Sequence, residues 1–367
     1  MYDTAGAEAP PRKTLHDSIC CDEKGDFSMS ERILGICLIG CGRAGMIHAR
    51  NYVNKVKGAR MVACVDVVEA AAKAAADELG CAKYFTDYHD ILSDPEVDAV
   101  VVVSPTDLHE GIVIDCANAG KHIFCEKPMA MNAAECEAMI EACRKNNVKL
   151  QIGFMRRHDK SFKQAKEVLD SGAIGDLVQI HSHTRGPSKP RPWMYDIRKS
   201  NGILAEVNSH DIDACRWFAG SDIDQLYAIA GNYRNPEARA DYPDYYDSVV
   251  MTGNFKNGVQ FVIDGAAYVQ YGYDSHVELV GTKGVLHVGT SEGSSVKCTT
   301  VEHGTSQPFI NSWMTLFEDA YLAEDNAFVQ AVLNDTETPV TGYDGLQAVK
   351  VVEAGNRSIQ TGEIVKM

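Results

Sequence analysis

The pattern of apolar and polar positions changes near residue 155. Before that point, short apolar runs without polar alternation, such as DAVVVV at Asp98–Val103, are separated by segments of helical period. Runs of this kind are typical of strands buried on both faces of a parallel sheet. We therefore predict a doubly wound α/β domain of Rossmann type over residues 32–154. Its strands are the run beginning at Ile33, then Met61–Val65, Lys83–Phe85, Asp98–Val103, His122–Cys125 and Lys149–Phe154; helices are expected at Ala70–Leu79, Tyr88–Leu92, His109–Ala119 and Ala133–Asn146.

Beyond residue 155 apolar and polar residues alternate, as in VQIHSHT at Val178–Thr184. Asp247–Phe255 and Val259–Tyr268 flank a Lys-Asn-Gly turn, which predicts a hairpin, and a second turn lies between Ser275–Val280 and Val285–Val288. We expect an α+β domain over residues 155–367 with a large, mostly antiparallel sheet. Its helices lie near Asp211–Phe218, Trp313–Leu333 and Gly345–Gln360, and the last can pack back on the first domain.

Composition excludes several classes of protein. The 367 residues are 45% hydrophobic, enough for two cores. The formal net charge is −16 and no long run of Lys and Arg occurs, so nucleic acid is not an expected partner. No apolar stretch approaches the roughly 18 residues of a membrane span. Residues 1–31 are polar and lack a period, which indicates a flexible extension.

The twelve cysteines are scattered through apolar segments and form no CxxC pair. That distribution favours free thiols in a reducing compartment, so we expect a cytoplasmic protein. No His/Cys ligand spacing is visible, and we expect no metal site. One face of the second domain's sheet has no predicted cover, and we expect a homo-oligomer to form through it.

A glycine turn follows the first predicted strand in the run ILGICLIGCGRAG. The spacing Gly40-x-Gly42-x-x-Gly45 before a helix is typical of dinucleotide binding, because the turn brings backbone N–H groups of the helix start to a pyrophosphate. Asp66 ends the second strand, where a carboxylate can bind both ribose hydroxyls of NAD. Val67 and Val68 follow and offer no cation for a 2′-phosphate, so NAD is expected rather than NADP. The predicted cofactor residues of this region are Gly40, Gly42, Arg43, Ala44, Gly45 and Asp66.

Further candidates follow the fourth and fifth strands, at the edge where doubly wound folds bind ligands. Ser104, Thr106 and His109 lie where the nicotinamide is expected, although Thr106 can equally cap the next helix. Glu126 and Lys127 come directly after the fifth strand and are expected beside the cofactor.

Several motifs occur in a recognisable order: Ser-Pro-Thr-x-x-His from Ser104, Glu-Lys-Pro from Glu126, GFMRRHD at residues 153–159, and Glu206-x-x-x-His210. In this order the chain resembles the glucose–fructose oxidoreductase / inositol dehydrogenase / MocA family, and most closely its inositol dehydrogenase-like branch. The resemblance covers residues 32–367.

The resemblance implies catalytic roles for three residues. His210 would be the general base, and Lys127 would hydrogen-bond the reacting hydroxyl and stabilise its alkoxide character. Family members usually carry Asp or Asn where this chain has Glu206, which could orient either partner or bind a neighbouring hydroxyl. Arg156 occupies a substrate-contacting position in relatives. His183 is a further candidate for polyol hydroxyls, and the loop aromatics Tyr245, Tyr246 and Trp193 could pack against sugar C–H surfaces.

The expected activity is NAD-dependent oxidation of a ring secondary alcohol to a ketone. An inositol and the 3-hydroxyl of a glucose or glucoside compete as substrates. Glu206, His183 and the loop aromatics tilt the choice slightly away from a standard inositol enzyme. Two other interpretations stay open: a redox-neutral sugar oxidoreductase or glycoside-cleaving enzyme with tightly held NAD, and a non-enzymatic sensor of NAD or sugar.

Overall fold

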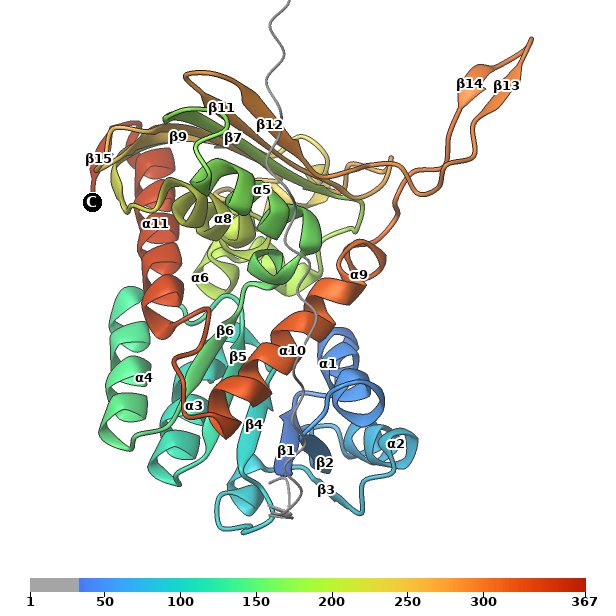
Figure 1. Cartoon of the computed structure of the whole chain (residues 1–367), viewed down its shortest axis with the longest axis vertical. Coiled ribbons are helices and arrows are strands. Elements are labelled where there is room, and N and C mark those ends of the chain that lie inside the picture. The colour runs from blue at the N-terminus through green and yellow to red at the C-terminus, as the bar shows by residue number, and fades with distance from the viewer. Residues whose placement is uncertain (1–32) are drawn as a thin grey trace, which may run out of the picture. The chain divides into compact units, whose positions relative to one another are not determined.

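The computed structural model describes residues 33–367, so the predicted N-terminal extension lies outside the described residues. The first domain is built on a six-stranded parallel sheet of order β3-β2-β1-β4-β5-β6 (Figure 1), which confirms the predicted Rossmann fold. The strands are β1 (Leu34–Ile39), β2 (Ala59–Val65), β3 (Lys83–Phe85), β4 (Ala99–Val102), β5 (His122–Glu126) and β6 (Leu150–Gly153).

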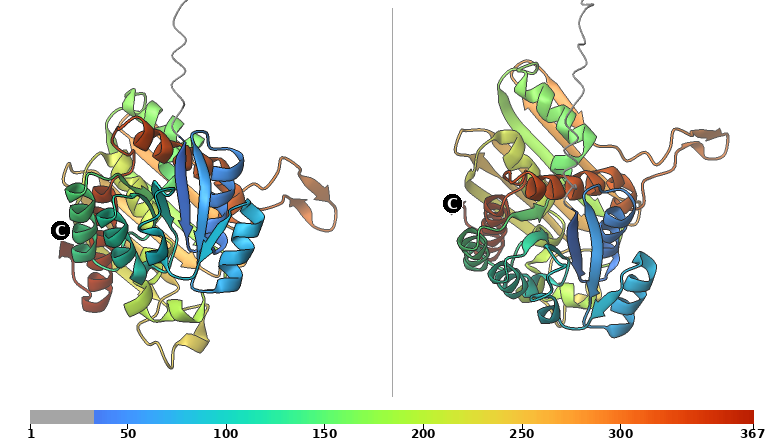
Figure 2. Two further views of the ribbon diagram at one scale, coloured as in Figure 1. Left: turned by 90° about the horizontal axis from the view of Figure 1, so that it is seen from below. Right: turned by 60° about the horizontal axis from the view of Figure 1, so that its bottom comes forward.

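Helices cover both faces of this sheet, as the continuous apolar strands require (Figure 2). Cys37 and Ile39 of β1 belong to the core on the side of α3 and α4, whereas Ile36 and Leu38 pack toward α1, α2 and α10. The helical segments of this domain are α1 (Arg43–Asn54), α2 (Glu69–Leu79), η1 (Tyr88–Ile91), η2 (Thr106–Leu108), α3 (His109–Asn118) and α4 (Ala133–Lys145).

The second domain holds a seven-stranded sheet of order β12-β11-β7-β10-β9-β8-β15. Only β7 and β10 pair in parallel, so the sheet is mostly antiparallel as predicted, and β9 and β10 form the expected hairpin. A small pair, β13 (Cys298–Thr300) and β14 (Gly304–Ser306), extends away from it (Figure 1). The strands of the large sheet are β7 (Leu177–Gly186), β8 (Ile223–Gly231), β9 (Ser248–Phe255), β10 (Gln260–Ala267), β11 (Asp274–Gly281), β12 (Val285–Val288) and β15 (Val365–Lys366).

The helices of the second half differ from the prediction in two respects. The predicted helix over 313–333 is divided at Phe317, whose backbone leaves helical geometry while its ring is buried beside Phe162 and Tyr273. Helix α5 and strand β8 were not predicted, although Asp159 caps α5 and could have signalled it. The segments are η3 (Met155–His158), α5 (Lys160–Asp170), η4 (Pro192–Tyr195), α6 (Ile197–Ser200), α7 (Gly202–Glu206), α8 (Ser209–Ala219), η5 (Pro236–Ala238), α9 (Trp313–Leu316), α10 (Glu318–Leu333) and α11 (Gly342–Thr361).

Helix α11 joins the two halves of the described chain. It lies against α4 and β6 of the first domain and against α8 and β8 of the second. Lys350 of α11 contacts Glu137 of α4, with 3.1 Å between Nζ and Oε1. No helix within residues 33–367 is both long and apolar enough to cross a membrane.

The two faces of the seven-stranded sheet have different surroundings. Along β7, Ile180, Ser182 and Thr184 are buried beneath α8 and η3, whereas the residues between them point to the opposite face and keep partial exposure. Helices therefore cover one face, and the other remains open over β7, β10, β11 and β12.

A glycine in β10 allows α8 to begin close to the covered face. Asn208, directly before α8, donates its Nδ2 hydrogen to the Asp264 carbonyl at 3.1 Å. A Cβ added to Gly265 would lie 1.8 Å from Asn208 Oδ1, so only glycine fits at this position.

We predict that Gly265→Ala lowers the free energy of unfolding by about 1–3 kcal/mol, because the methyl group displaces Asn208. Gly111→Ala in α3 is the matched control, since nothing lies within 4 Å of its added Cβ; better helix propensity should stabilise that variant by about 1 kcal/mol. Urea unfolding followed by circular dichroism measures both. Equal stability of the two variants would contradict the packing at Gly265.

Candidate active site

The glycine turn has the geometry of an anion-binding helix start. Gly40 adopts φ +101°, a region that favours glycine. A Cβ on Gly45 would lie 2.1 Å from the Gly40 carbonyl oxygen, so the third glycine is needed for close packing. A Cβ on Gly42 would meet nothing within 4 Å, which leaves open space beside the turn. No side chain within residues 33–367 caps α1 after Gly42, so its first N–H groups remain available for an anion.

The end of β2 completes a surface that fits a dinucleotide. The Cys41 N–H donates to Asp66 Oδ2 at 2.9 Å, which fixes the carboxylate beside the glycine turn. Val67 is 83% exposed and Val68 is 56% exposed, so an apolar surface suited to an adenine lies next to the Asp66 carboxylate. The structure therefore brings Asp66 and the glycine turn together at one end of the sheet.

The residues after β4 divide into two groups. Ser104 and Thr106 stay partly exposed at the carboxyl edge of the sheet, where a nicotinamide could reach them. His109 is buried, with Nε2 2.9 Å from the Ser104 carbonyl oxygen and Nδ1 3.0 Å from that of Pro128. Burial lowers the pKa of His109. Its ring therefore ties the loop after β4 to the loop after β5, and this differs from the direct cofactor contact that was expected.

Lys127, Glu206 and His210 come together from the two domains. Lys127 follows β5, precedes a cis peptide bond to Pro128, and donates from Nζ to the Glu206 carbonyl oxygen at 3.0 Å. His210 lies in the first turn of α8, and its ring meets that of Phe154 edge-on at a centroid distance of 5.9 Å. The predicted catalytic set therefore forms one cluster at the edge of the sheet that carries the glycine turn.

The surroundings of this cluster favour the neutral form of the His210 imidazole and the protonated form of the Glu206 carboxyl group. Burial, together with the nearby charges of Lys127 and Arg156, places the pKa of His210 well below its ordinary value. Its Nδ1 is enclosed without a partner in the described chain, so the accessible edge of the ring is the Nε2 side. Burial raises the pKa of Glu206, and Lys127 partly offsets this effect.

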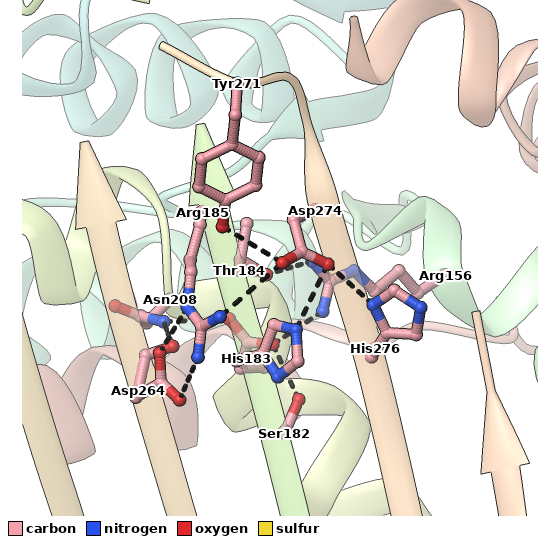
Figure 3. Close-up of polar contacts among 11 residues, drawn as sticks. Arg156, Ser182, His183, Thr184, Arg185, Asn208, Asp264, Tyr271, Asp274 and His276 are labelled. Carbon is pink, nitrogen blue, oxygen red and sulfur yellow. Dashed lines mark hydrogen bonds and ion pairs between the residues drawn. The ribbon is translucent and has the colours of Figure 1, made fainter. Parts of the chain in front are cut away.

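Arg156 holds the start of α8 in place instead of projecting a free donor. Its Nη1 is 2.8 Å from Asp211 Oδ1, and its Nη2 donates to Thr184 Oγ1 at 2.5 Å (Figure 3). Asp211 also accepts hydrogen bonds from Ser182 Oγ at 2.6 Å and Asn208 Nδ2 at 2.9 Å. The guanidinium is only 1% exposed. The expected substrate contact by Arg156 therefore needs correction, since the structure commits this side chain to the residue after His210.

His183 does not join the cluster. Its neighbours in β7, Ser182 and Thr184, point toward Asp211 and Arg156, so His183 projects from the opposite face of the sheet (Figure 3). There its Nε2 lies 3.2 Å from Asp274 Oδ1. The expected substrate contact is therefore corrected as well, because the sheet separates His183 from His210.

The loop tyrosines also differ from expectation. Tyr245 and Tyr246 are 3% and 2% exposed. Tyr246 donates its hydroxyl hydrogen to Asn356 Oδ1 at 2.7 Å, and Tyr245 packs edge-on against Tyr195. Both aromatic rings are therefore held by contacts within the protein and present little surface for a sugar.

A buried network beneath Lys127 was missed by the sequence analysis. His48 of α1 lies between two carboxylates, with Nδ1 2.7 Å from Asp325 Oδ1 and Nε2 3.0 Å from Glu126 Oε1. The other Glu126 oxygen accepts the Lys127 backbone N–H at 2.9 Å. Both Glu126 oxygens are thus engaged, and the residue supports Lys127 from below. The polar residues His48 and Asn51 on the buried face of α1 were the available signal.

Glu324 of α10 belongs to the same network. It is fully buried, and neither carboxyl oxygen has a hydrogen-bond partner within residues 33–367. Burial holds the pKa of Glu324 well above its ordinary value. For His48, burial acts in the opposite direction, but Asp325 and Glu126 outweigh it and the pKa is raised well above its ordinary value. We infer a charged imidazole and a protonated Glu324 at neutral pH.

Comparison with known proteins also assigns a nucleotide-binding site to the first domain. Residues 34–154 match the family model described as "Oxidoreductase family, NAD-binding Rossmann fold", and residues 162–287 match the "GFO/IDH/MocA C-terminal domain". The chain is similar to the myo-inositol 2-dehydrogenase of Thermotoga maritima, with 34% identity over 332 residues, covering 90% of this chain and 98% of the relative. The inositol 2-dehydrogenase of Rhizobium meliloti is 34% identical over 88% of this chain and 96% of its own length.

A solved structure with ligands is also similar. The scyllo-inositol dehydrogenase of Lactobacillus casei, with bound NAD(H) and scyllo-inositol, aligns with a TM-score of 0.83 and 30% identity, covering 91% of this chain and 99% of that chain. Together with the glycine turn and Asp66, these similarities identify NAD as the cofactor.

We predict that Asp211→Asn lowers the free energy of unfolding by about 3–5 kcal/mol, because it leaves the Arg156 charge buried without a counter-ion. Asp196→Asn is the matched control, since the Arg198 partner of Asp196 is 87% exposed and an exposed ion pair contributes less than about 1 kcal/mol. Urea unfolding of both variants provides the comparison. A loss at Asp211 no larger than at Asp196 would contradict the role given to the buried pair.

A second prediction concerns pH. For both His48 and Glu324 the folded pKa is raised, so the native state binds more protons than the unfolded state and stability falls as pH rises. The loss of stability due to Glu324 begins above pH about 4.3, its pKa in the unfolded chain. The loss due to His48 begins above pH about 6.5 for the same reason. Glu324→Gln should therefore stabilise the protein more at pH 8 than at pH 5, as measured by thermal unfolding. An unchanged pH profile would show that Glu324 is ionised in the fold.

Proposed function

This chain belongs to the GFO/IDH/MocA family of NAD-binding oxidoreductases, and we propose that it oxidises a ring secondary hydroxyl of a cyclic polyol of the inositol class to a ketone. The observation that carries the proposal is the meeting of Lys127, Glu206 and His210 at the sheet edge that also carries the glycine turn. A lysine donor and a neutral imidazole in one buried cluster are the groups needed to remove a hydroxyl proton.

His210 acts as the base in this proposal. Its low pKa keeps the ring neutral at physiological pH, so the Nε2 side can accept the hydroxyl proton. Enclosure of the ring by Phe154 and α8 fixes its orientation before substrate arrives. Bound NAD supplies the hydride acceptor at nicotinamide C4.

Lys127 orients the hydroxyl and stabilises its developing negative charge. Its ammonium group already lies at the Glu206 carbonyl, and the Glu126 carboxylate holds its backbone N–H. Such a preorganised charged donor lowers the barrier without rearranging during the reaction. Lys127 therefore contributes more to the transition state than to binding of the alcohol.

Glu206 is the residue that we propose to select the substrate. Its carboxyl group has no hydrogen-bond or ion-pair partner within residues 33–367 and lies at the cluster, so it can bind a hydroxyl next to the reacting one. The cyclic polyols meet this requirement, since every ring carbon of an inositol carries a hydroxyl.

Two structural observations support an inositol over a glucoside as the proposed substrate. Of the three features that tilted the sequence analysis away from an inositol enzyme, His183 lies across the sheet and the tyrosines are buried. Glu206 and Trp193 remain, since Trp193 is 41% exposed, and Glu206 does not disfavour an inositol. The 3-hydroxyl of glucose is therefore the second candidate. We also propose that a homo-oligomer forms through the open face of the sheet.

We predict a rise in reduced-nicotinamide absorbance when the purified protein meets myo-inositol or scyllo-inositol in the presence of NAD, and a much smaller rise with glucose or a methyl glucoside. The first recording is made without added cofactor. A stoichiometric rise that persists until a keto-sugar is added would instead favour the redox-neutral interpretation with tightly held NAD.

Lys127→Ala is the control for mechanism. It should lower turnover by roughly 10²–10⁴-fold while NAD affinity, measured by fluorescence quenching, stays nearly unchanged. Near-normal turnover in this variant would remove the proposed mechanism. If neither NAD nor NADP gives a signal with any of the alcohols while NAD still binds, the sensor interpretation replaces the enzyme.

A further inference from the structure

Helix α7 ends at Glu206 and is attached to the first domain at both of its ends. At its last residue, the Glu206 carbonyl oxygen accepts a hydrogen bond from Lys127 Nζ at 3.0 Å. At its start, Asn201 directly precedes the helix and donates from Nδ2 to the Met131 carbonyl oxygen at 2.7 Å. Lys127 and Met131 both belong to the loop between β5 and α4. The second domain therefore binds this loop twice through one short helix.

The two hydrogen bonds fix the helix along the loop in one direction. Asn201 at the helix start meets Met131 near the end of the loop, whereas Glu206 at the helix end meets Lys127 at the beginning of the loop. The helix thus lies antiparallel to the loop. Because α7 has only five residues, it makes few hydrogen bonds of its own and depends on outside contacts for its position.

We propose that Asn201 is a positioning residue for the reaction, because its hydrogen bond to Met131 sets the place at which Glu206 meets Lys127. This role rests on the function proposed above, in which Glu206 binds a substrate hydroxyl and Lys127 stabilises negative charge. Asn201 acts through these two residues. Without its amide, α7 is tied to the loop only at the Lys127 end, and the two side chains lose their fixed separation.

The backbone at the start of α7 shows that the amide is more than a turn residue requires. Asn201 has φ +54° and ψ +18°, and Gly202 has φ +71°, so two consecutive residues are left-handed. Asparagine adopts this conformation more readily than most residues, but glycine adopts it at a lower cost. Glycine would have no amide to reach Met131. The asparagine therefore supplies a contact between the domains that the turn by itself does not need.

A buried set of contacts holds the Asn201 backbone. Asn356 of α11 donates from Nδ2 to the Asn201 carbonyl oxygen at 3.0 Å, and Tyr246 donates its hydroxyl hydrogen to Asn356 Oδ1 at 2.7 Å. The same hydroxyl accepts the Leu204 backbone N–H at 3.5 Å, and both Tyr246 and Leu204 are buried. These contacts come from α11 and from the loop before β9. The side chain of Asn201 is therefore directed at Met131 by a rigid support.

Asn201→Gly is the variant that isolates the amide, because glycine keeps the left-handed backbone. With the alcohol that the unaltered chain oxidises, we expect kcat to fall roughly 10–100-fold, with a smaller rise in KM. NAD affinity and the urea midpoint should change little, since the preference of glycine for this conformation offsets the lost hydrogen bond. Asn201→Asp replaces the donor by an acceptor of the same shape and should not restore kcat.

Asn147→Gly is the matched control. Asn147 has φ +52° and an exposed side chain in the first domain, so the same substitution is made at the same backbone conformation. Its kcat should equal that of the unaltered chain. An unchanged kcat in Asn201→Gly would overturn the proposal, as would equal losses of kcat in the two glycine variants.

A double-mutant cycle with Lys127→Ala distinguishes positioning from a general structural effect. If Asn201 acts through the contact between Lys127 and Glu206, adding Asn201→Gly to Lys127→Ala should lower kcat by less than about 3-fold, because that contact is already absent. A further loss as large as the one caused by Asn201→Gly alone would contradict the positioning role.

Hydrogen–deuterium exchange followed by mass spectrometry provides a readout that does not require turnover. The backbone amides of residues 203–208 should exchange roughly fivefold faster in Asn201→Gly than in the unaltered chain or in Asn147→Gly, because one hydrogen bond less holds α7 in place. Unchanged exchange would overturn the proposal. Faster exchange in a protein that oxidises no alcohol would support the attachment of α7 by Asn201 and count against the proposed function.

Discussion

The burial of one positive charge organises the region where substrate is handled. Arg156 is nearly inaccessible to water, and Asp211 is its counter-ion. Because an unmatched charge in such a place is very unfavourable, η3, β7 and α8 must keep the positions that bring the pair together. His210 directly precedes Asp211 in the chain, so its place is determined by an interaction in which it takes no part. A second pair, Arg157 with Asp213, connects the same segments to Asp344 of α11.

Lys127 is attached to both halves of the molecule. Its backbone N–H is held by Glu126, which is fixed through His48 to α1 and α10. Its ammonium group reaches the carbonyl of Glu206 in the second domain. Helix α1, which follows the glycine turn, is therefore connected to Lys127 by a continuous series of hydrogen bonds.

The sequence predicted those features that depend on nearby residues. Local pattern predicted the strands before residue 155 and the glycine turn with Asp66. The order of the motifs predicted that Lys127 and His210 belong together. The roles of Arg156 and His183 could not be predicted, since they depend on the direction of a side chain and on distant partners. His48 and Asp325 are 277 positions apart, and no local pattern connects them.

Side chains of β7 alternate between the two faces of the sheet, and this limits which mutations the strand can accept. Consecutive residues of one strand supply the hydroxyls that contact Asp211 and Arg156 and the imidazole that faces Asp274. Amino-acid replacements can alter one face while the other is preserved. A deletion or insertion of a single codon just before Ser182 would exchange the two sets, with imidazoles turned toward the buried arginine and hydroxyls toward solvent. Strand β7 therefore tolerates substitutions but not insertions or deletions. Its length should be the least variable part of the domain.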